Sequence, residues 1–146
     1  LASLVDRLNN IKVKGVSNFE EAMMRYKKQL KGRCLVLVIS DFLFDEEEIK
    51  NGLMRLGKHE VKVVQVLDRE EKEMKMYGDV KLFDSETNQI LKTFMSRRLR
   101  QKYVQKLNDH SSKIHDVCVK LGAGFCQITS DDDLFDSFYK VLRHSE

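Results

Sequence analysis

The amino-acid sequence predicts an α/β fold in which parallel strands alternate with helices. The run from Leu35 to Ile39 holds five aliphatic residues, too few for a helix core and typical of a strand buried on both faces. A second apolar run, from Val61 to Leu67, and helical periodicity around both runs support the same class. We therefore expect a Rossmann-like three-layer sandwich with three parallel strands, an inserted β-hairpin and helices on both faces.

Composition and charge describe an ordinary globular protein, and we expect a single domain over residues 1–146. The content of 42% hydrophobic and 34% charged residues is usual, and the net charge of +3 is near balance, which argues against a nucleic-acid partner. No apolar run approaches the roughly 18 residues that span a bilayer, and the first residues do not resemble an export signal. The three cysteines lack the spacing of a disulfide framework. We expect a cytoplasmic protein with no membrane span in this chain.

Helical periodicity and capping residues place the first elements. Apolar residues at helical spacing open the chain without a capping residue before them, so we expect a fragment that begins within a fold. Ser17 opens a Ser-x-x-Glu capping box at the start of a helix over 18–30. The strand over 34–39 follows, and Asp45 caps a helix over 46–57.

The second half of the chain continues the alternation, after a charged segment over 69–79 that we expect to be a loop. In chain order, the sequence then predicts hairpin strands over 80–83 and 89–94, a long helix over 97–121 between Ser96 and Gly122, a strand over 125–128 and a helix over 132–143. With the parallel strands side by side in chain order, the helices over 46–57 and 97–121 share one face of the sheet. The helices over 18–30 and 132–143 then cover the other face.

Polar residues stand where the predicted strands end. Ser40 and Asp41 follow the first apolar run, and open α/β sheets bind ligands at the carboxyl ends of their strands. A carboxylate after a buried strand must be exposed or paired, so Asp41 is a candidate ligand. Ser17 supplies a second oxygen from a polar loop upstream, although a hydroxyl there is also typical of a helix cap. Asp68, after the second strand, is interpreted as a surface cap.

Other clusters favour structural roles. The basic residues within 97–102 have no neighbouring aromatic platform in the sequence and are typical of a solvated helix face. His115 and Cys118 have helical spacing suitable for zinc, but no second pair of ligands accompanies them. The acidic run over 131–133 is typical of the start of a helix.

Several short motifs follow one another in a distinctive order. They are Gly15-Val16-Ser17, Leu35 to Asp41, His59-Glu60-Val61, Val66-Leu67-Asp68, Asp84-Ser85-Glu86-Thr87 and Thr129-Ser130-Asp131. Their order resembles that of a MoxR-associated bacterial family of von Willebrand factor A-like proteins of unknown function. In that family a Gly-x-Thr-type loop precedes a strand ending in Ser-Asp, and a strand ending in Leu-Asp precedes a hairpin with an Asp-x-Glu-Thr turn. The resemblance extends over nearly the whole chain.

The resemblance implies that residues 1–146 are the C-terminal portion of a von Willebrand factor A-like domain whose first strands precede Leu1. The family's metal-ion-dependent adhesion site combines an Asp-x-Ser-x-Ser loop, a Thr from a second loop and an Asp from a third. By position, Ser17 replaces the Thr and Asp41 is the third-loop acid. No Asp-x-Ser-x-Ser motif occurs in this sequence. We therefore expect an incomplete metal site of Ser17 and Asp41, with no cofactor in this chain and Mg²⁺ in the intact protein.

The resemblance also implies a function. We expect a non-enzymatic protein-interaction module, which in the intact protein binds its partner with the help of a metal ion, beside a MoxR-type AAA+ ATPase. The alternative is a nucleotide- or phosphate-handling enzyme of the doubly wound α/β type, but the sequence lacks a glycine-rich phosphate loop or a nucleophile elbow. The apolar strand over 34–39 also predicts a homo-oligomer in which two copies pair through this strand.

Overall fold

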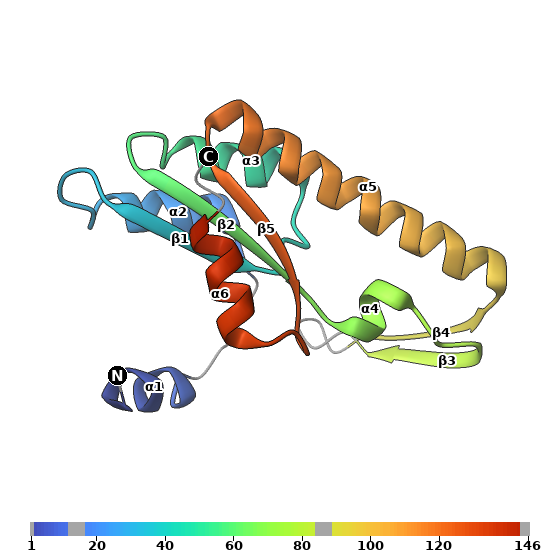
Figure 1. Ribbon diagram of the computed structural model, residues 1–146. Coiled ribbons are helices and arrows are strands. Elements are labelled where there is room, and N and C mark those ends of the chain that lie inside the picture. Colours follow the sequence, from blue (N-terminus) through green and yellow to red (C-terminus); the bar gives the residue numbers. More distant parts are fainter. Residues whose placement is uncertain (1, 12–16, 84–88, 144–146) are drawn as a thin grey trace.

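A parallel sheet between two layers of helices forms the body of the molecule (Figure 1). The computed structural model describes residues 2–11, 17–83 and 89–143. The sheet has the order β1-β2-β5 and consists of β1 (Leu35–Ser40), β2 (Glu60–Leu67) and β5 (Gly124–Thr129). The predicted α/β sandwich with three parallel strands in chain order is therefore confirmed.

The helices and the hairpin also follow the predicted order. They are α1 (Ala2–Asn9), α2 (Phe19–Lys27), α3 (Glu46–Met54), α4 (Arg69–Glu73), α5 (Arg97–Leu121), α6 (Leu134–Arg143) and the antiparallel strands β3 (Gly78–Phe83) and β4 (Ile90–Met95). Among the described residues, no helix has both the length and the apolar character needed to cross a membrane. The turn over 84–88 and the residues Gly15 and Val16, on which part of the resemblance rests, lie outside the described residues.

Two local predictions were wrong. The charged segment after β2 begins with the short helix α4, because Asp68 and Glu71 form a reciprocal capping box there. The cap of α2 is Asn18, not Ser17: the Asn18 side chain accepts a hydrogen bond of 2.7 Å from the amide of Glu21. Glu20 does not complete a capping box, because it pairs with Arg55, and the hydrogen bonds from Arg55 lower the pKa of the Glu20 carboxyl.

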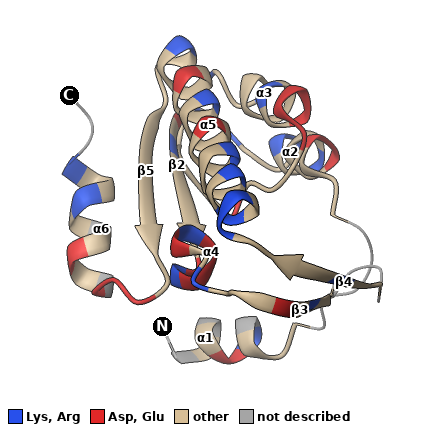
Figure 2. Cartoon of the chain, turned by 90° about the vertical axis from the view of Figure 1, so that its right-hand side faces the viewer, with Lys and Arg blue, Asp and Glu red and all other residues tan. Residues whose placement is uncertain are grey.

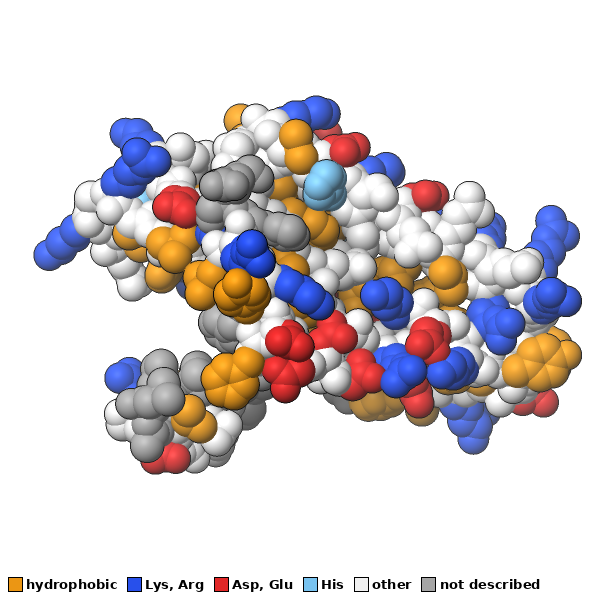
Figure 3. Space-filling model, in the orientation of Figure 1, with side chains coloured by type: hydrophobic (Ala, Val, Ile, Leu, Met, Phe, Trp, Pro, Cys, Tyr) orange, Lys and Arg blue, Asp and Glu red, His pale blue; other side chains and the backbone are white. Residues whose placement is uncertain are grey.

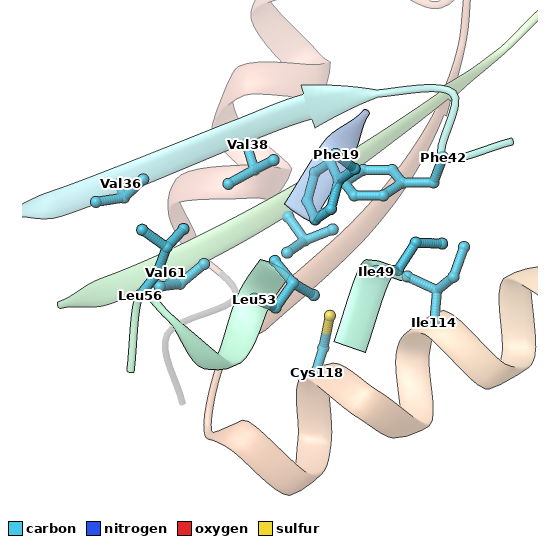
Figure 4. Close-up of a cluster of buried hydrophobic side chains, with 11 residues drawn as sticks. Phe19, Val36, Val38, Phe42, Ile49, Leu53, Leu56, Val61, Ile114 and Cys118 are labelled. Carbon is cyan, nitrogen blue, oxygen red and sulfur yellow. The ribbon is translucent and has the colours of Figure 1, made fainter. Parts of the chain in front are cut away.

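The main hydrophobic core lies on one face of the sheet (Figure 4). Its buried side chains come from β1, β2, α2, α3 and α5, and among those labelled in the figure are Phe19, Val36, Val38, Phe42, Ile49, Leu53, Val61, Ile114 and Cys118. The expectation that α2 covers the opposite face is therefore wrong. Gly52 of α3 explains the placement, because a Cβ atom at this position would lie only 2.6 Å from the ring of Phe19.

The opposite face of the sheet is covered by α6, which packs against β2 and β5 (Figure 2). Val141 of α6 lies in a small cluster with Val64 and Cys126. The buried ammonium of Lys62 donates to the backbone oxygens of Val141 and Leu142, at 3.0 and 2.9 Å. A positive charge at the C-terminal end of a helix is favourable, so Lys62 holds α6 on the sheet. Leu35, Leu37 and Ile39 of the edge strand β1 remain exposed on this face.

Candidate functional site

Each parallel strand is followed by a polar residue at the carboxyl edge of the sheet, namely Asp41, Asp68 and Ser130. Two of them are engaged with each other, because the Ser130 hydroxyl donates to the Asp68 carboxylate over 3.1 Å. The same carboxylate accepts from the amide of Glu70 at 2.8 Å, which confirms that Asp68 is a surface cap. Asp41 stands apart from this cluster and differs in its environment.

The Asp41 carboxylate is exposed, while one of its oxygens fixes the turn that follows β1. Its Oδ1 atom accepts hydrogen bonds from the amide of Leu43 at 3.2 Å and from the hydroxyl of Ser40 at 3.3 Å. The Ser40 hydroxyl in turn accepts from the amide of Phe42 at 3.0 Å. Among the described residues, no hydrogen bond to the Oδ2 atom of this exposed side chain is found.

The backbone of the Asp41 turn is held from two neighbouring elements. Gln65 of β2 donates from Nε2 to the backbone carbonyl oxygen of Asp41 at 3.1 Å. The Nε2 atom of His110 lies 2.7 Å from the backbone carbonyl oxygen of Phe42. A carbonyl oxygen only accepts, so Nε2 carries the proton in the His110 ring. Phe42 itself is completely buried, and its backbone φ angle is +56°, a value that residues other than glycine seldom adopt. The exposed Asp41 carboxylate thus stands on a fixed turn.

Sequence reasoning missed the buried polar side chains behind this turn. Gln65 is completely buried, and its Oε1 atom accepts a hydrogen bond of 3.1 Å from Nε2 of Gln127. The same Nε2 atom lies 3.2 Å from the hydroxyl of Ser111 on α5. The available signal was a glutamine inside each of two apolar strands, since a buried amide requires partners. These side chains connect α5 and β5 to the backbone of Asp41.

The start of α2, which follows Ser17, lies next to the turn that carries Asp41. Phe19, two residues after Ser17, packs its ring against the ring of Phe42, with centroids 5.5 Å apart. The amide of Phe19 also donates to the Glu48 carboxylate of α3. The structure therefore brings the start of α2 close to the turn that carries Asp41, while the pairing of Ser17 with Asp41 as metal ligands stays a prediction.

The two predicted ligands fit a magnesium ion in kind but not in number. A hydroxyl and a carboxylate are the hard oxygen donors that Mg²⁺ prefers, but the ion takes about six ligands. Within the described residues, no group of three or more His, Cys, Asp or Glu side chains could hold a metal ion. In this chain, Ser17 and Asp41 can form only part of a site.

A hollow of about 310 Å³ lies beside the Asp41 turn, between that turn and α5. It is lined by Leu43, Phe44, Tyr103, Lys106, Leu107 and His110. Burial, and to a smaller extent the negative charge of Glu71, raises the pKa of Tyr103. The hollow therefore combines apolar side chains with the polar ends of Tyr103, Lys106 and His110.

One family model matches most of the chain. The model of a family described as "Protein of unknown function DUF58" matches residues 1–113. The chain belongs to the DUF58 family. No curated protein and no solved structure matches it.

The remaining candidate in this DUF58 chain is the spacing of His115 and Cys118 on α5, and it is not a ligand pair. Cys118 is completely buried, and burial raises the pKa of its thiol to about 12. Within the described residues, these two side chains belong to no group that could hold a metal ion. The His115 ring instead packs edge-on against Phe125, with centroids 5.6 Å apart.

Proposed function

We propose that this DUF58 chain is the C-terminal part of a von Willebrand factor A-like domain that acts as a non-enzymatic, cytoplasmic protein-interaction module. The order of its motifs supports this reading, together with the α/β fold. In the intact protein the module would bind its partner beside a MoxR-type AAA+ ATPase. The doubly wound enzyme alternative has less support, since β1, β2 and β5 are each followed by a polar residue and not by a glycine-rich loop.

The observation that carries the proposal is the fixed turn beneath an exposed carboxylate. Gln65 and His110 hold the backbone of residues 41 and 42, while the Asp41 carboxylate faces solvent. A group that is already ordered loses little conformational entropy when a partner binds. An exposed acid without such support would be an ordinary surface residue, so the support favours recognition at Asp41.

We propose that Mg²⁺ assists this recognition only in the intact protein. Asp41 and Ser17 would hold the ion, further oxygens would come from outside this chain, and an acidic side chain of the partner would complete the coordination. The chain alone should then bind Mg²⁺ weakly or not at all in isothermal titration calorimetry. A low-micromolar Mg²⁺ site that Asp41→Ala abolishes would contradict the proposal that further ligands come from outside this chain.

Partner capture by the intact protein tests the function itself. We expect partner proteins to be retained from lysate with Mg²⁺, and to be lost with a chelator or in the Asp41→Ala variant. Asp109→Ala is the matched control, because it removes an exposed carboxylate from α5. Partners that are unaffected by chelation and by Asp41→Ala would refute metal-assisted recognition, and turnover of a small phosphate substrate would favour the enzyme alternative.

The exposed edge of β1 supports a second expectation, the homo-oligomer through this strand. β1 pairs with β2 alone among the described strands. Its side chains on the α6 face of the sheet, Leu35, Leu37 and Ile39, are exposed. Unpaired strand edges with apolar side chains are templates for pairing with another chain. We expect dimers or larger species in sedimentation velocity at high concentration, and fewer in Ile39→Lys. A monodisperse monomer at every concentration would exclude pairing through β1.

A further inference from the structure

The β3–β4 hairpin has one face that is exposed along its whole described length. Directly opposite residues of antiparallel strands share a face, and the pairs on this face are Asp79 with Phe94, Lys81 with Lys92 and Phe83 with Ile90. All six side chains are exposed. The other face is more covered, with Val80, Leu82 and Thr93 partly buried and Met95 buried, although Leu91 on this face is exposed. We call the first one the outer face of the hairpin.

The outer face carries an unusual concentration of large apolar side chains. Phe83, Ile90 and Phe94 are 62%, 61% and 55% exposed, and Tyr77, at 71%, lies beside them. The rings of Tyr77 and Phe94 are in contact, with centroids 6.0 Å apart. In the register of the hairpin, the Lys81–Lys92 pair separates Phe94 from Phe83 and Ile90. Large apolar side chains exposed together often mark an interaction site in proteins. The outer face is therefore expected to be covered by a partner.

Charge indicates that this partner is anionic. Lys81 and Lys92 stand directly opposite each other, an arrangement that destabilises a hairpin unless an anion lies between them. Within the described residues neither lysine forms an ion pair, and both line a hollow of about 320 Å³ together with Phe94 and Asp79. Asp79 is the one carboxylate among the six paired side chains of this face.

The surrounding sequence extends the positive charge. Residues 75–102 contain seven Lys or Arg and three Asp or Glu, a net charge of +4, whereas the whole chain has +3. The rest of the chain is thus slightly acidic. Arg97 and Arg98, at the start of α5, are exposed directly after β4. Figure 2 colours Lys and Arg positions at the start of α5 blue, next to the hairpin, and Figure 3 shows Lys and Arg side chains, among some Asp and Glu, at the end of the molecule formed by the hairpin and the start of α5.

We propose that the outer face of the hairpin docks on an anionic lipid bilayer. Phe83, Ile90 and Phe94 would enter the boundary between headgroups and acyl chains, and Lys81 and Lys92 would contact lipid phosphates. An exposed surface that combines aromatic, aliphatic and basic side chains is typical of interfacial binding. A second copy of the chain fits poorly, because packing two outer faces against each other would bring their lysines together. The proposal is independent of the function proposed for Asp41.

A single tryptophan provides a direct probe, because the chain contains none. In Phe83→Trp, we expect the emission to shift to the blue when vesicles of phosphatidylcholine with one third phosphatidylglycerol are added, and brominated acyl chains to quench it. Tyr26→Trp, at an exposed position on α2, is the control and should not respond. The absence of a shift in Phe83→Trp would overturn the proposal.

Charge variants test the role of the two lysines in vesicle sedimentation. Lys81→Gln with Lys92→Gln should weaken binding at least tenfold, since each basic residue near an anionic surface contributes roughly a fivefold factor. Lys27→Gln with Lys28→Gln removes the same charge from exposed positions at the end of α2 and should change binding much less. Lys81→Arg with Lys92→Arg should retain binding, and circular dichroism verifies that each variant is folded.

The outcomes separate a bilayer from other anionic partners. Equal loss of vesicle binding in the hairpin and α2 variants would refute a specific role for the outer face. A single-stranded oligothymidylate is the second probe. Its binding, if lost in Lys81→Gln with Lys92→Gln while vesicle binding is absent, would identify the face as a nucleic-acid surface and overturn the proposal.

Discussion

Replacing Phe42 by alanine should lower the free energy of unfolding by about 3–5 kcal/mol, the usual range for truncating a buried phenylalanine. The Phe42 side chain is completely buried, and its ring contacts Phe19 at the junction of β1, α2 and α3. Its removal leaves a cavity at the centre of the main core and frees the turn that carries Asp41. Urea denaturation, followed by far-UV circular dichroism, measures the change.

The backbone of Phe42 provides a sharper comparison. Its φ angle of +56° lies in the left-handed region, which costs about 1–2 kcal/mol for residues with a Cβ atom and little for glycine. Phe42→Gly and Phe42→Ala remove the same ring, so the glycine variant should be the more stable of the two by about 1 kcal/mol. An alanine variant that is clearly more stable than the glycine variant would show that the backbone there is not strained.

Replacing Gly52 by valine should destabilise the fold by about 1–3 kcal/mol, because inserting atoms into a packed interface forces its neighbours apart. A Cβ atom at residue 52 would lie 2.6 Å from two ring atoms of Phe19 and 3.2 Å from Cγ of Met23. The expected loss is a separation of α2 from α3, measured by urea denaturation and by faster hydrogen exchange in α2.

Two variants separate this contact from helix propensity. Lys50→Val places the same β-branched residue at an exposed position of α3, where it should cost less than about 1 kcal/mol. Phe19→Leu should recover part of the loss when it is combined with Gly52→Val, because the smaller side chain leaves room at the helix interface. Equal losses in Gly52→Val and Lys50→Val would mean that the close approach of the helices does not matter.

Much of this fold was predictable from local patterns. The apolar runs identified β1 and β2, and the stripe between Ser96 and Gly122 identified the whole of α5, whose cap and left-handed end are as expected. These features depend on residues close together in the sequence. The side of the sheet that α2 covers was not predictable in this way, because it depends on the absence of a side chain at Gly52, a contact between distant segments.

In the candidate site, too, the features set by nearby residues were predictable and those set by distant contacts were not. Asp41 was predictable because a carboxylate directly after a buried strand has a defined place in a parallel sheet. Phe19 packs against Phe42 and so brings the start of α2 to the Asp41 turn, but Asn18, not Ser17, is the residue that caps α2. The supports from Gln65, Gln127 and His110 could not be predicted, since their partners are backbone atoms and amides fixed only by tertiary packing.

The long helix α5 connects the hairpin to the turn that carries Asp41. Its first turn follows the hairpin directly. Further along the same helix, His110 contacts the backbone of the Asp41 turn, and Ser111 is connected to that turn through Gln127 and Gln65. The rise from Ser96 to His110 is about 21 Å in an α-helix. Any surface that holds the hairpin would therefore also set the height and tilt of the Asp41 carboxylate above it, so that a partner would meet this edge at one defined distance from that surface.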